Sequence, residues 1–265
     1  MKQQELSKMN EVGWNQSAYQ AWINRHGLPK EYAQKLIANP SQAISHYLKY
    51  MGDVRSKKIA NLLGSKGNKA VSFALLGAEV TVVDISKDNS RYALELADEA
   101  GAPIKYIVSD VLDIPEYEKL VDFDFILLEL GVLHYFVDLQ PLFELVYHSL
   151  KPGGRFIVRD YHPFVSKLLR AEENKMIASG DYFDNELVEV DVAYSILLTD
   201  TEKANLNKNT IRRWTLGEIV TAIAKAGLRM EMLEEESGVR WAFPKDSPGN
   251  IEKKIPGLFT IIAKK

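Results

Sequence analysis

The stretch IANLLGSKGNKAVSFALLGAEVTVVDIS, residues 59–86, decides the fold class. An apolar run at 59–64 is followed by a helix-like run at 68–77 and a β-branched apolar run at 79–85. A strand, a helix and a second strand joined by short glycine-containing turns form a βαβ unit, which places both strands parallel in one sheet. The stretch therefore predicts the first unit of an α/β domain.

The same alternation continues along the chain. Further helices are expected at 89–101, 138–150 and 215–227, and further strands at 104–110, 123–133, 155–161, 228–236 and 257–265. The strands are apolar almost throughout, as in sheets that helices cover on both faces. We therefore expect a doubly wound, mostly parallel sheet of seven strands.

Two segments fall outside this alternation. Residues 1–50 read as a helical extension, so the core domain is expected at 51–265. Within that domain, the charged segment 163–213 breaks the rhythm and is expected to form an insertion that caps the pocket. In the extension, Trp14, Tyr19 and Trp22 are candidates for covering the pocket, although their helical spacing also suits packing residues.

The composition excludes several kinds of protein and site. The 265 residues are 46% hydrophobic and carry a formal net charge of −3, which gives no sign of a general affinity for nucleic acid or anionic membranes. Without cysteine there is no disulfide or thiolate site, and the five histidines form no close pair, so no metal site is expected. The polar N-terminus and the lack of a long apolar run predict a cytoplasmic protein with no membrane span.

Chemically distinctive residues fall where the strands end. Gly64 and Gly67 leave the backbone accessible at the start of a helix, and Asp84 follows Gly67 by 17 residues at the end of the second strand. Asp110 ends the third strand and Glu129 the fourth. Because the carboxyl ends of parallel strands meet at one edge, these residues predict a slot of nucleoside size, with Asp84 facing the two ribose hydroxyls.

The cofactor is not decided by the loop alone. The loop reads GSKGNKA and lacks the G-x-G-x-x-G fingerprint of dehydrogenases, although a nicotinamide enzyme with a variant loop would also use Asp84. Tyr147 and Lys151 match a Tyr-x-x-x-Lys pair, but Lys151 belongs to a turn expected to face away from the slot. An NAD-dependent oxidoreductase and a non-catalytic cofactor-binding protein therefore remain alternatives.

Several segments together resemble the class I S-adenosylmethionine-dependent methyltransferases, from about Lys58 to the C-terminus. GAEVTVVDIS resembles the second strand of that family, SDVLDIP its adenine-side segment, LLELGVLHYF its fourth strand, and LKPGGRFIVRD the turn into its fifth strand. The C-terminal segments RRWTLGEIVTAIAKAGLRMEMLEE and PGLFTIIAKK resemble its last helix and closing hairpin. The resemblance implies an antiparallel last strand and S-adenosylmethionine as cofactor, with S-adenosylhomocysteine as product.

The resemblance also assigns residues to the cofactor. The family loop reads acidic-x-Gly-x-Gly-x-Gly, and in this chain Asn61, Leu63 and Ser65 stand at the acidic position and the first two glycines. The implied cofactor-binding residues are Asn61, Gly64, Ser65, Gly67, Asp84, Ile85, Asp110, Val111, Leu112, Glu129, Leu130 and Gly131. Only Gly67 keeps a loop glycine of the pattern, so Asn61 and Leu63 are the positions where weakened cofactor binding is expected.

The chemistry demands no particular catalytic residue, because positioning can suffice when the methyl carbon is already activated. The candidates near the pocket mouth are His134, Tyr161 and His162 for catalysis, and Tyr19, Tyr135, Arg213 and Trp214 for substrate contacts. Arg213 and Trp214 suit an acidic or aromatic acceptor. We expect a small-molecule acceptor methylated on O, N or C, no nucleic-acid substrate, and a monomer or homodimer.

Overall fold

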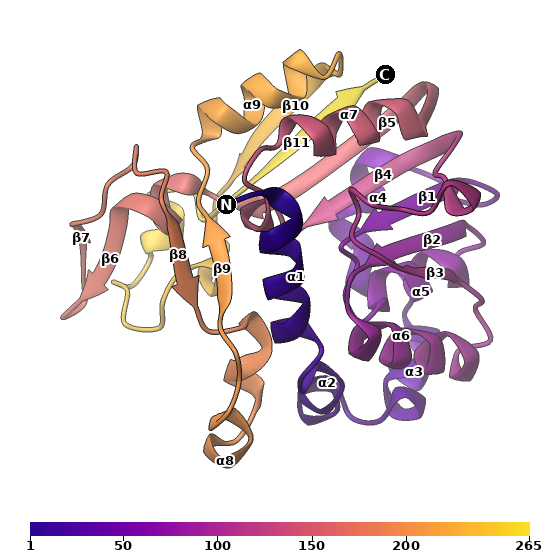
Figure 1. The fold of residues 1–265 in the computed structure, drawn as a ribbon, viewed down its shortest axis with the longest axis horizontal. Coiled ribbons are helices and arrows are strands. Elements are labelled where there is room, and N and C mark those ends of the chain that lie inside the picture. Colours follow the sequence, from indigo (N-terminus) through magenta and orange to yellow (C-terminus); the bar gives the residue numbers. More distant parts are fainter.

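A seven-stranded sheet forms the centre of the molecule in the computed structural model, which describes residues 1–265 (Figure 1). Its strands are β1 (Lys58–Leu62), β2 (Glu79–Asp84), β3 (Lys105–Val108), β4 (Phe123–Glu129), β5 (Leu150–Tyr161), β10 (Arg229–Glu236) and β11 (Leu258–Lys264). Their order is β10-β11-β5-β4-β1-β2-β3, and β11 runs antiparallel to both of its neighbours. The remaining pairs are parallel, so the expected fold class and the antiparallel last strand are confirmed.

Helices cover both faces of this sheet because its central strands β1, β4 and β11 bury side chains on both sides. On one face, α7 (Gln140–Ser149) and α9 (Leu216–Lys225) pack on alternate residues such as Leu62 and Leu128. On the other face, α5 (Asn68–Leu75) packs on Ile59 and the neighbouring strands. The helix α6 (Lys87–Glu99) packs on α3 (Pro29–Ala38) at the edge near β3.

The first fifty residues fold as helices that pack against the core. They are α1 (Gln3–Trp14), α2 (Ala18–His26), α3, and α4 (Ser45–Met51) after one 3₁₀ turn (Gln42–Ile44). Only α1 crosses the carboxyl edge of the sheet, where it lies beside β9 (Asn209–Arg212) (Figure 1). The extension therefore contributes directly to the edge at which ligands of such sheets bind.

The segment between β5 and α9 forms two hairpins of its own rather than extending the sheet. One pairs β6 (Leu169–Glu172) with β7 (Lys175–Ala178), and the other pairs β8 (Leu187–Val190) with β9; the short helix α8 (Asp200–Lys203) precedes β9. Both hairpins lie on the side of the molecule where the parallel strands end (Figure 1). Strand β9 of the second hairpin lies beside α1 at that edge.

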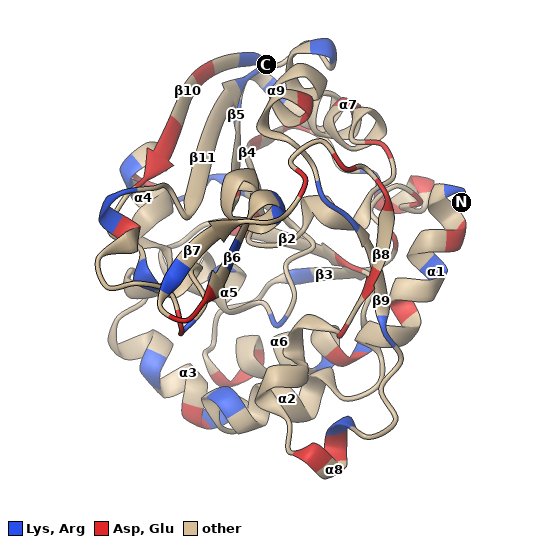
Figure 2. Cartoon of the chain, turned by 90° about the vertical axis from the view of Figure 1, so that its left-hand side faces the viewer, with Lys and Arg blue, Asp and Glu red and all other residues tan.

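The surface shows no segregation of charge on the face drawn in Figure 2. Basic and acidic residues are interspersed over the face drawn in Figure 2, and β10 carries a run of glutamates. No helix combines the length and the apolar character that a bilayer crossing requires.

Candidate active site

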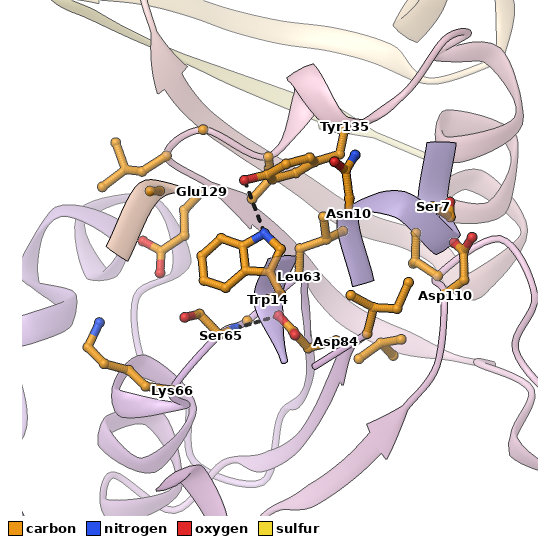
Figure 3. A pocket seen from close by; sticks show the side chains of 18 of the residues that line it. Ser7, Asn10, Trp14, Leu63, Ser65, Lys66, Asp84, Asp110, Glu129 and Tyr135 are labelled. Carbon is orange, nitrogen blue, oxygen red and sulfur yellow. Dashed lines mark hydrogen bonds between the residues drawn. The ribbon is translucent and has the colours of Figure 1, made fainter. Parts of the chain in front are cut away.

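A cavity of about 260 Å³ lies at the carboxyl ends of the parallel strands, beneath α1 (Figure 3). The predicted residues that line it are Gly64, Ser65, Asp84, Ile85, Asp110, Val111, Glu129, Leu130, Gly131 and Tyr135. Because the sheet order is β4-β1-β2-β3, the strand ends place Glu129, the β1–α5 loop, Asp84 and Asp110 in that sequence across the cavity. The strand ends that the sequence places at one edge of the sheet thus line a single cavity.

Asp84 lies at the centre of this cavity and is held rigidly. Its Oδ2 accepts a hydrogen bond from the backbone N–H of Ser65 at 2.9 Å, and its Oδ1 accepts from Ser86 N at 2.9 Å and from Asn89 Nδ2 at 3.2 Å. Burial raises the pKa of the Asp84 carboxyl, while these three donors act in the opposite direction. Since a carboxylate has about four acceptor positions, Asp84 can still accept bonds from a ligand.

The β1–α5 loop keeps the backbone shape of a glycine loop with other residues in it. Leu63 and Ser65 have φ values of +49° and +50°, a left-handed region that disfavours side chains with a Cβ. Gly67 has φ +72°, and a Cβ there would lie 2.6 Å from Cβ of Ala93 on α6. Gly67 therefore lets α5 approach α6, and it does not line the cavity.

We call the part of the cavity formed by Ser109, Asp110 and Val111 the Asp110 end. Asp110 Oδ1 accepts a hydrogen bond from Leu112 N at 3.0 Å, which folds the segment after β3 into a tight turn. Val111 is buried in the core on α7's side of the sheet, so it offers an apolar wall, whereas Leu112 does not line the cavity. This end combines one carboxylate with an apolar surface.

We call the opposite part, formed by Trp22, Lys66, Lys69 and Glu129, the Lys66 end (Figure 3). Lys69 Nζ forms an ion pair with Glu129 Oε1 at 2.8 Å, and Tyr47 Oη donates to Glu129 Oε2 at 2.5 Å. Lys66 Nζ lies 4.5 Å from the centre of the Trp22 ring. This end is strongly charged, and the sequence patterns do not assign Lys66 or Lys69 to the site.

The helix α1 forms the roof of the cavity with one polar stripe. Gln3, Ser7, Asn10 and Trp14 all line the cavity, at a spacing of three or four residues that puts them on one face of a helix. Asn10 exchanges two hydrogen bonds with the backbone of Thr210, of 2.9 and 2.8 Å. Of these four residues only Trp14 is predicted from the sequence, although the spacing of the polar residues is visible there.

The roof is tied to the loop after β4. Trp14 Nε1 donates to Tyr135 Oη at 3.2 Å (Figure 3), and Gln3 Nε2 donates to the carbonyl oxygen of Tyr135 at 3.0 Å. The backbone N–H of Val137 donates in turn to Gln3 Oε1 at 2.8 Å. These bonds hold α1 over the cavity.

A second, smaller cavity of about 60 Å³ lies behind Gly131. His134, Tyr161, Arg213 and Trp214 are among the residues that line it, and a Cβ on Gly131 would lie 3.3 Å from the His134 ring and 3.7 Å from that of Tyr161. Gly131 lines the larger cavity, so the His134 and Tyr161 rings of the smaller cavity lie directly behind a residue of the larger one.

Burial affects the protonation state of the side chains that line the smaller cavity. Burial, and then the Arg213 guanidinium, lower the pKa of His134 to about 4, so its ring is neutral at physiological pH. The Arg213 guanidinium itself forms no ion pair, unlike Arg212, whose Nη2 lies 2.8 Å from Glu218 Oε1. Trp214 Nε1 donates to the carbonyl oxygen of Leu133 at 2.9 Å, which fixes this wall.

Besides Gly67 and Leu112, three more predicted residues, Tyr19, His162 and Asn61, line neither cavity. Tyr19 packs on Tyr92 and hydrogen-bonds Glu95, so of the three aromatic candidates in the extension only Trp14 and Trp22 line the cavity. His162 is buried, with Nε2 2.9 Å from Glu235 Oε1 and Nδ1 accepting from the Phe164 N–H, so both ring nitrogens are occupied.

Asn61 is the third. It is fully buried in β1 beneath Gly64, and neither its Oδ1 nor its Nδ2 has a hydrogen-bond partner. Its side chain lies below the floor of the cavity instead of lining it.

Comparison with known proteins identifies the domain. Residues 63–158 match the family model described as "Methyltransferase domain". This range begins in the β1–α5 loop and ends within β5, so it contains the strand ends that form most of the cavity floor. A search of curated proteins found no match to the chain.

Solved structures share the fold at low sequence identity. An S-adenosylmethionine-dependent methyltransferase from Mesorhizobium loti is 20% identical with a TM-score of 0.60, over 83% of this chain and 96% of that one. Magnesium protoporphyrin IX methyltransferase from Synechocystis, solved with bound S-adenosylhomocysteine, is 12% identical with a TM-score of 0.59, over 98% of this chain and 99% of that one. At such identities the likeness concerns the fold.

Proposed function

Since its methyltransferase domain and its fold make the chain a class I S-adenosylmethionine-dependent methyltransferase, we propose that it methylates a small organic acceptor that carries an anionic group. The observation that carries this proposal is the order of chemical groups across the two cavities. The larger one suits the cofactor, and the smaller one adds an unpaired guanidinium and a neutral imidazole behind Gly131.

The residues of the larger cavity fit the cofactor. Asp84, with about one of its four acceptor positions left after its three protein donors, is suited to a hydroxyl of the ribose. The apolar wall at Val111 is suited to the flat adenine, and the carboxylate of Asp110 lies beside that wall. The left-handed backbone at Leu63 and Ser65 keeps the loop curved, so the backbone at Gly64 and Ser65 can approach the ligand closely.

The smaller cavity fits part of an acceptor. An anionic group of the acceptor would pair with Arg213, which has no carboxylate partner in the protein. The charge of a half-buried guanidinium is stabilised by such a pairing, and the bidentate geometry of arginine suits a carboxylate or phosphate. Trp214 and Tyr161 add aromatic surface to the same walls.

The bound cofactor supplies a methyl group on a positively charged sulfur, which makes that carbon electrophilic. The protein then has to hold the acceptor in line with it and to exclude water, and the roof formed by Trp14 and Gln3 does the latter. His134 is neutral above about pH 4 and can accept the proton that the acceptor loses. With so low a pKa, His134 suits an acceptor group that is itself acidic.

Ligand binding measured by calorimetry tests the cofactor assignment. S-adenosylhomocysteine is expected to bind with a single site per chain, whereas NAD gives no heat of binding. The alternatives predict other outcomes. Binding of NAD alone would contradict the proposal, and cofactor binding without turnover over a broad panel of anionic acceptors would favour the non-catalytic alternative.

Two variants test the acceptor assignment once turnover is found. Arg213→Met should raise KM for an anionic acceptor about tenfold with little change in kcat, and Arg213→Lys should recover part of that loss. His134→Ala should lower kcat, whereas wild-type kcat should not fall between pH 8 and pH 5, because His134 stays neutral over that range. Unchanged turnover of His134→Ala across pH would rule out this residue as the base.

A further inference from the structure

The Lys66 end of the larger cavity contains more positive than negative charge. Its two lysines face a single carboxylate, that of Glu129, which is already bound by Lys69 and Tyr47. Lys66 forms no ion pair and donates no hydrogen bond within the protein; its ammonium group lies over the ring of Trp22. An ammonium group that lines a cavity without a partner is unfavourable unless a ligand supplies the anion.

The pKa of the Lys66 ammonium group reflects this unfavourable position. Burial lowers its pKa to about 7, and the positive charges of Lys69 and Arg25 act in the same direction, while Glu129 acts against them. His26 is also near Lys66; burial and then the charge of Lys66 lower its pKa to about 3, so its ring stays neutral. A ligand anion beside Lys66 would restore its proton.

The order of the strands decides which part of the cofactor reaches this end. Adenine, ribose and methionine follow one another in the cofactor, and Asp84 at the centre takes the ribose. The apolar wall at Val111 then takes the adenine, which leaves the methionine portion to the Lys66 end (Figure 3). The reverse orientation would place the neutral adenine between two lysines and a glutamate.

We propose that Lys66 binds the α-carboxylate of the methionine portion of S-adenosylmethionine. The inference rests on the proposed function. Glu129 lies at the same end and presents negative charge to the α-ammonium group beside that carboxylate. The site therefore distinguishes the whole cofactor from nucleosides that lack the amino-acid portion.

The test compares two ligands on one protein by calorimetry. S-adenosylhomocysteine carries the carboxylate, and 5′-methylthioadenosine has the same adenine, ribose and sulfur without the amino-acid portion. Lys66→Met should weaken the binding of S-adenosylhomocysteine about 30-fold and change that of 5′-methylthioadenosine less than about twofold. Lys66→Arg, which keeps the charge, should recover most of the loss.

A matched control removes the same charge elsewhere. Lys225 is exposed at the end of α9 and forms no ion pair, so Lys225→Met should leave both affinities unchanged. Equal losses for the two ligands in Lys66→Met, or no loss for either, would overturn the inference while leaving the proposed function intact. If the wild type bound neither ligand, the proposed function would fail first, and the inference with it.

The pH dependence gives a second readout that packing alone would not produce. Because Lys66 must be protonated to bind the carboxylate and has a pKa of about 7 in the free protein, the affinity for S-adenosylhomocysteine should be greatest below pH 7. It should fall by at most about tenfold per pH unit above that value. The affinity for 5′-methylthioadenosine, and both affinities in Lys66→Met, should lack this fall near pH 7.

Discussion

The two ends of the large cavity are built in different ways. Around Asp84 and Asp110, the strand ends themselves supply the functional groups. Each carboxylate accepts a backbone N–H of its own turn, and Asp84 accepts that of Ser65 as well. At the Lys66 end, only Glu129 comes from a strand end, and the other groups are long side chains from the β1–α5 loop, α5 and α2, held by an ion pair and an aromatic ring. The first end is determined by the sheet, and the second depends mainly on side chains outside it.

The largest expected loss of ligand affinity comes from changing Asp84, which lies between the two ends of the cavity. Asp84→Asn keeps the shape of the side chain but removes its charge, and an amide can accept only through its single oxygen. The affinities for S-adenosylhomocysteine and 5′-methylthioadenosine should both fall roughly 100-fold, since a charge-assisted hydrogen bond to the ribose is lost. Calorimetry with the two ligands measures both losses.

Asp84→Asn should weaken the binding of both ligands equally, whereas Lys66→Met should weaken only that of S-adenosylhomocysteine. If Asp84→Asn weakened only S-adenosylhomocysteine, the ribose would not lie at Asp84, and the assignment of the two ends would be wrong. Asp88→Asn, two residues beyond the Ser86 cap on the first turn of α6, provides a nearby change of charge that should affect neither affinity by more than about twofold.

The next largest effect concerns Gly67 of the β1–α5 loop, which we expect to matter for folding and not for ligand binding. Gly67→Ala should lower the free energy of unfolding by about 2 to 3 kcal/mol, because the new Cβ meets Ala93 at 2.6 Å in a left-handed backbone. Thermal unfolding measures it. Gly217→Ala on α9, where a Cβ would meet nothing within 4 Å, should instead raise stability slightly. A stable Gly67→Ala protein with lost cofactor affinity would mean that Gly67 contacts the ligand.

The difference between the two ends also explains what the sequence can predict. The strand ends follow from period and apolar runs, so the sequence alone places Asp84, Asp110 and Glu129 on one edge, and all three line the cavity. The stripe of Gln3, Ser7 and Asn10 has helical spacing, but spacing does not say that α1 crosses the edge, which depends on its pairing with β9.

The residues that sequence patterns miss or misplace depend on side-chain direction. Lys66 faces the cavity because Ser65 and Gly67 on either side of it have positive φ, which no local pattern in the sequence signals. The predictions for Tyr19 and His162 rest on residue type, and tertiary packing turns both side chains away from the cavities. The prediction for Asn61 rests on alignment with the family loop, and its side chain lies under the cavity floor.

A smaller effect tests whether the Lys66 end is held by its charges. Tyr47→Phe removes the 2.5 Å hydrogen bond to Glu129, so stability should fall by about 1 to 1.5 kcal/mol and the affinity for S-adenosylhomocysteine by a few-fold, with no change for 5′-methylthioadenosine. Chemical denaturation and calorimetry measure these quantities. Tyr50→Phe, which removes a 2.6 Å bond to the more exposed Glu234, should change stability by less than about 0.5 kcal/mol. Equal effects of the two variants would argue against a special role for the buried pair.

The smallest effect comes from the two left-handed residues of the loop. Ser65→Gly relieves the strained backbone but gives the unfolded chain more freedom, so the net gain in stability should be about 0.5 kcal/mol or less. Leu63→Gly relieves the same strain and also removes a side chain that packs on the core, so stability should fall by about 1 to 2 kcal/mol. Opposite signs in thermal unfolding would show that Leu63 stands at a glycine position because the core, and not the cofactor, holds its side chain.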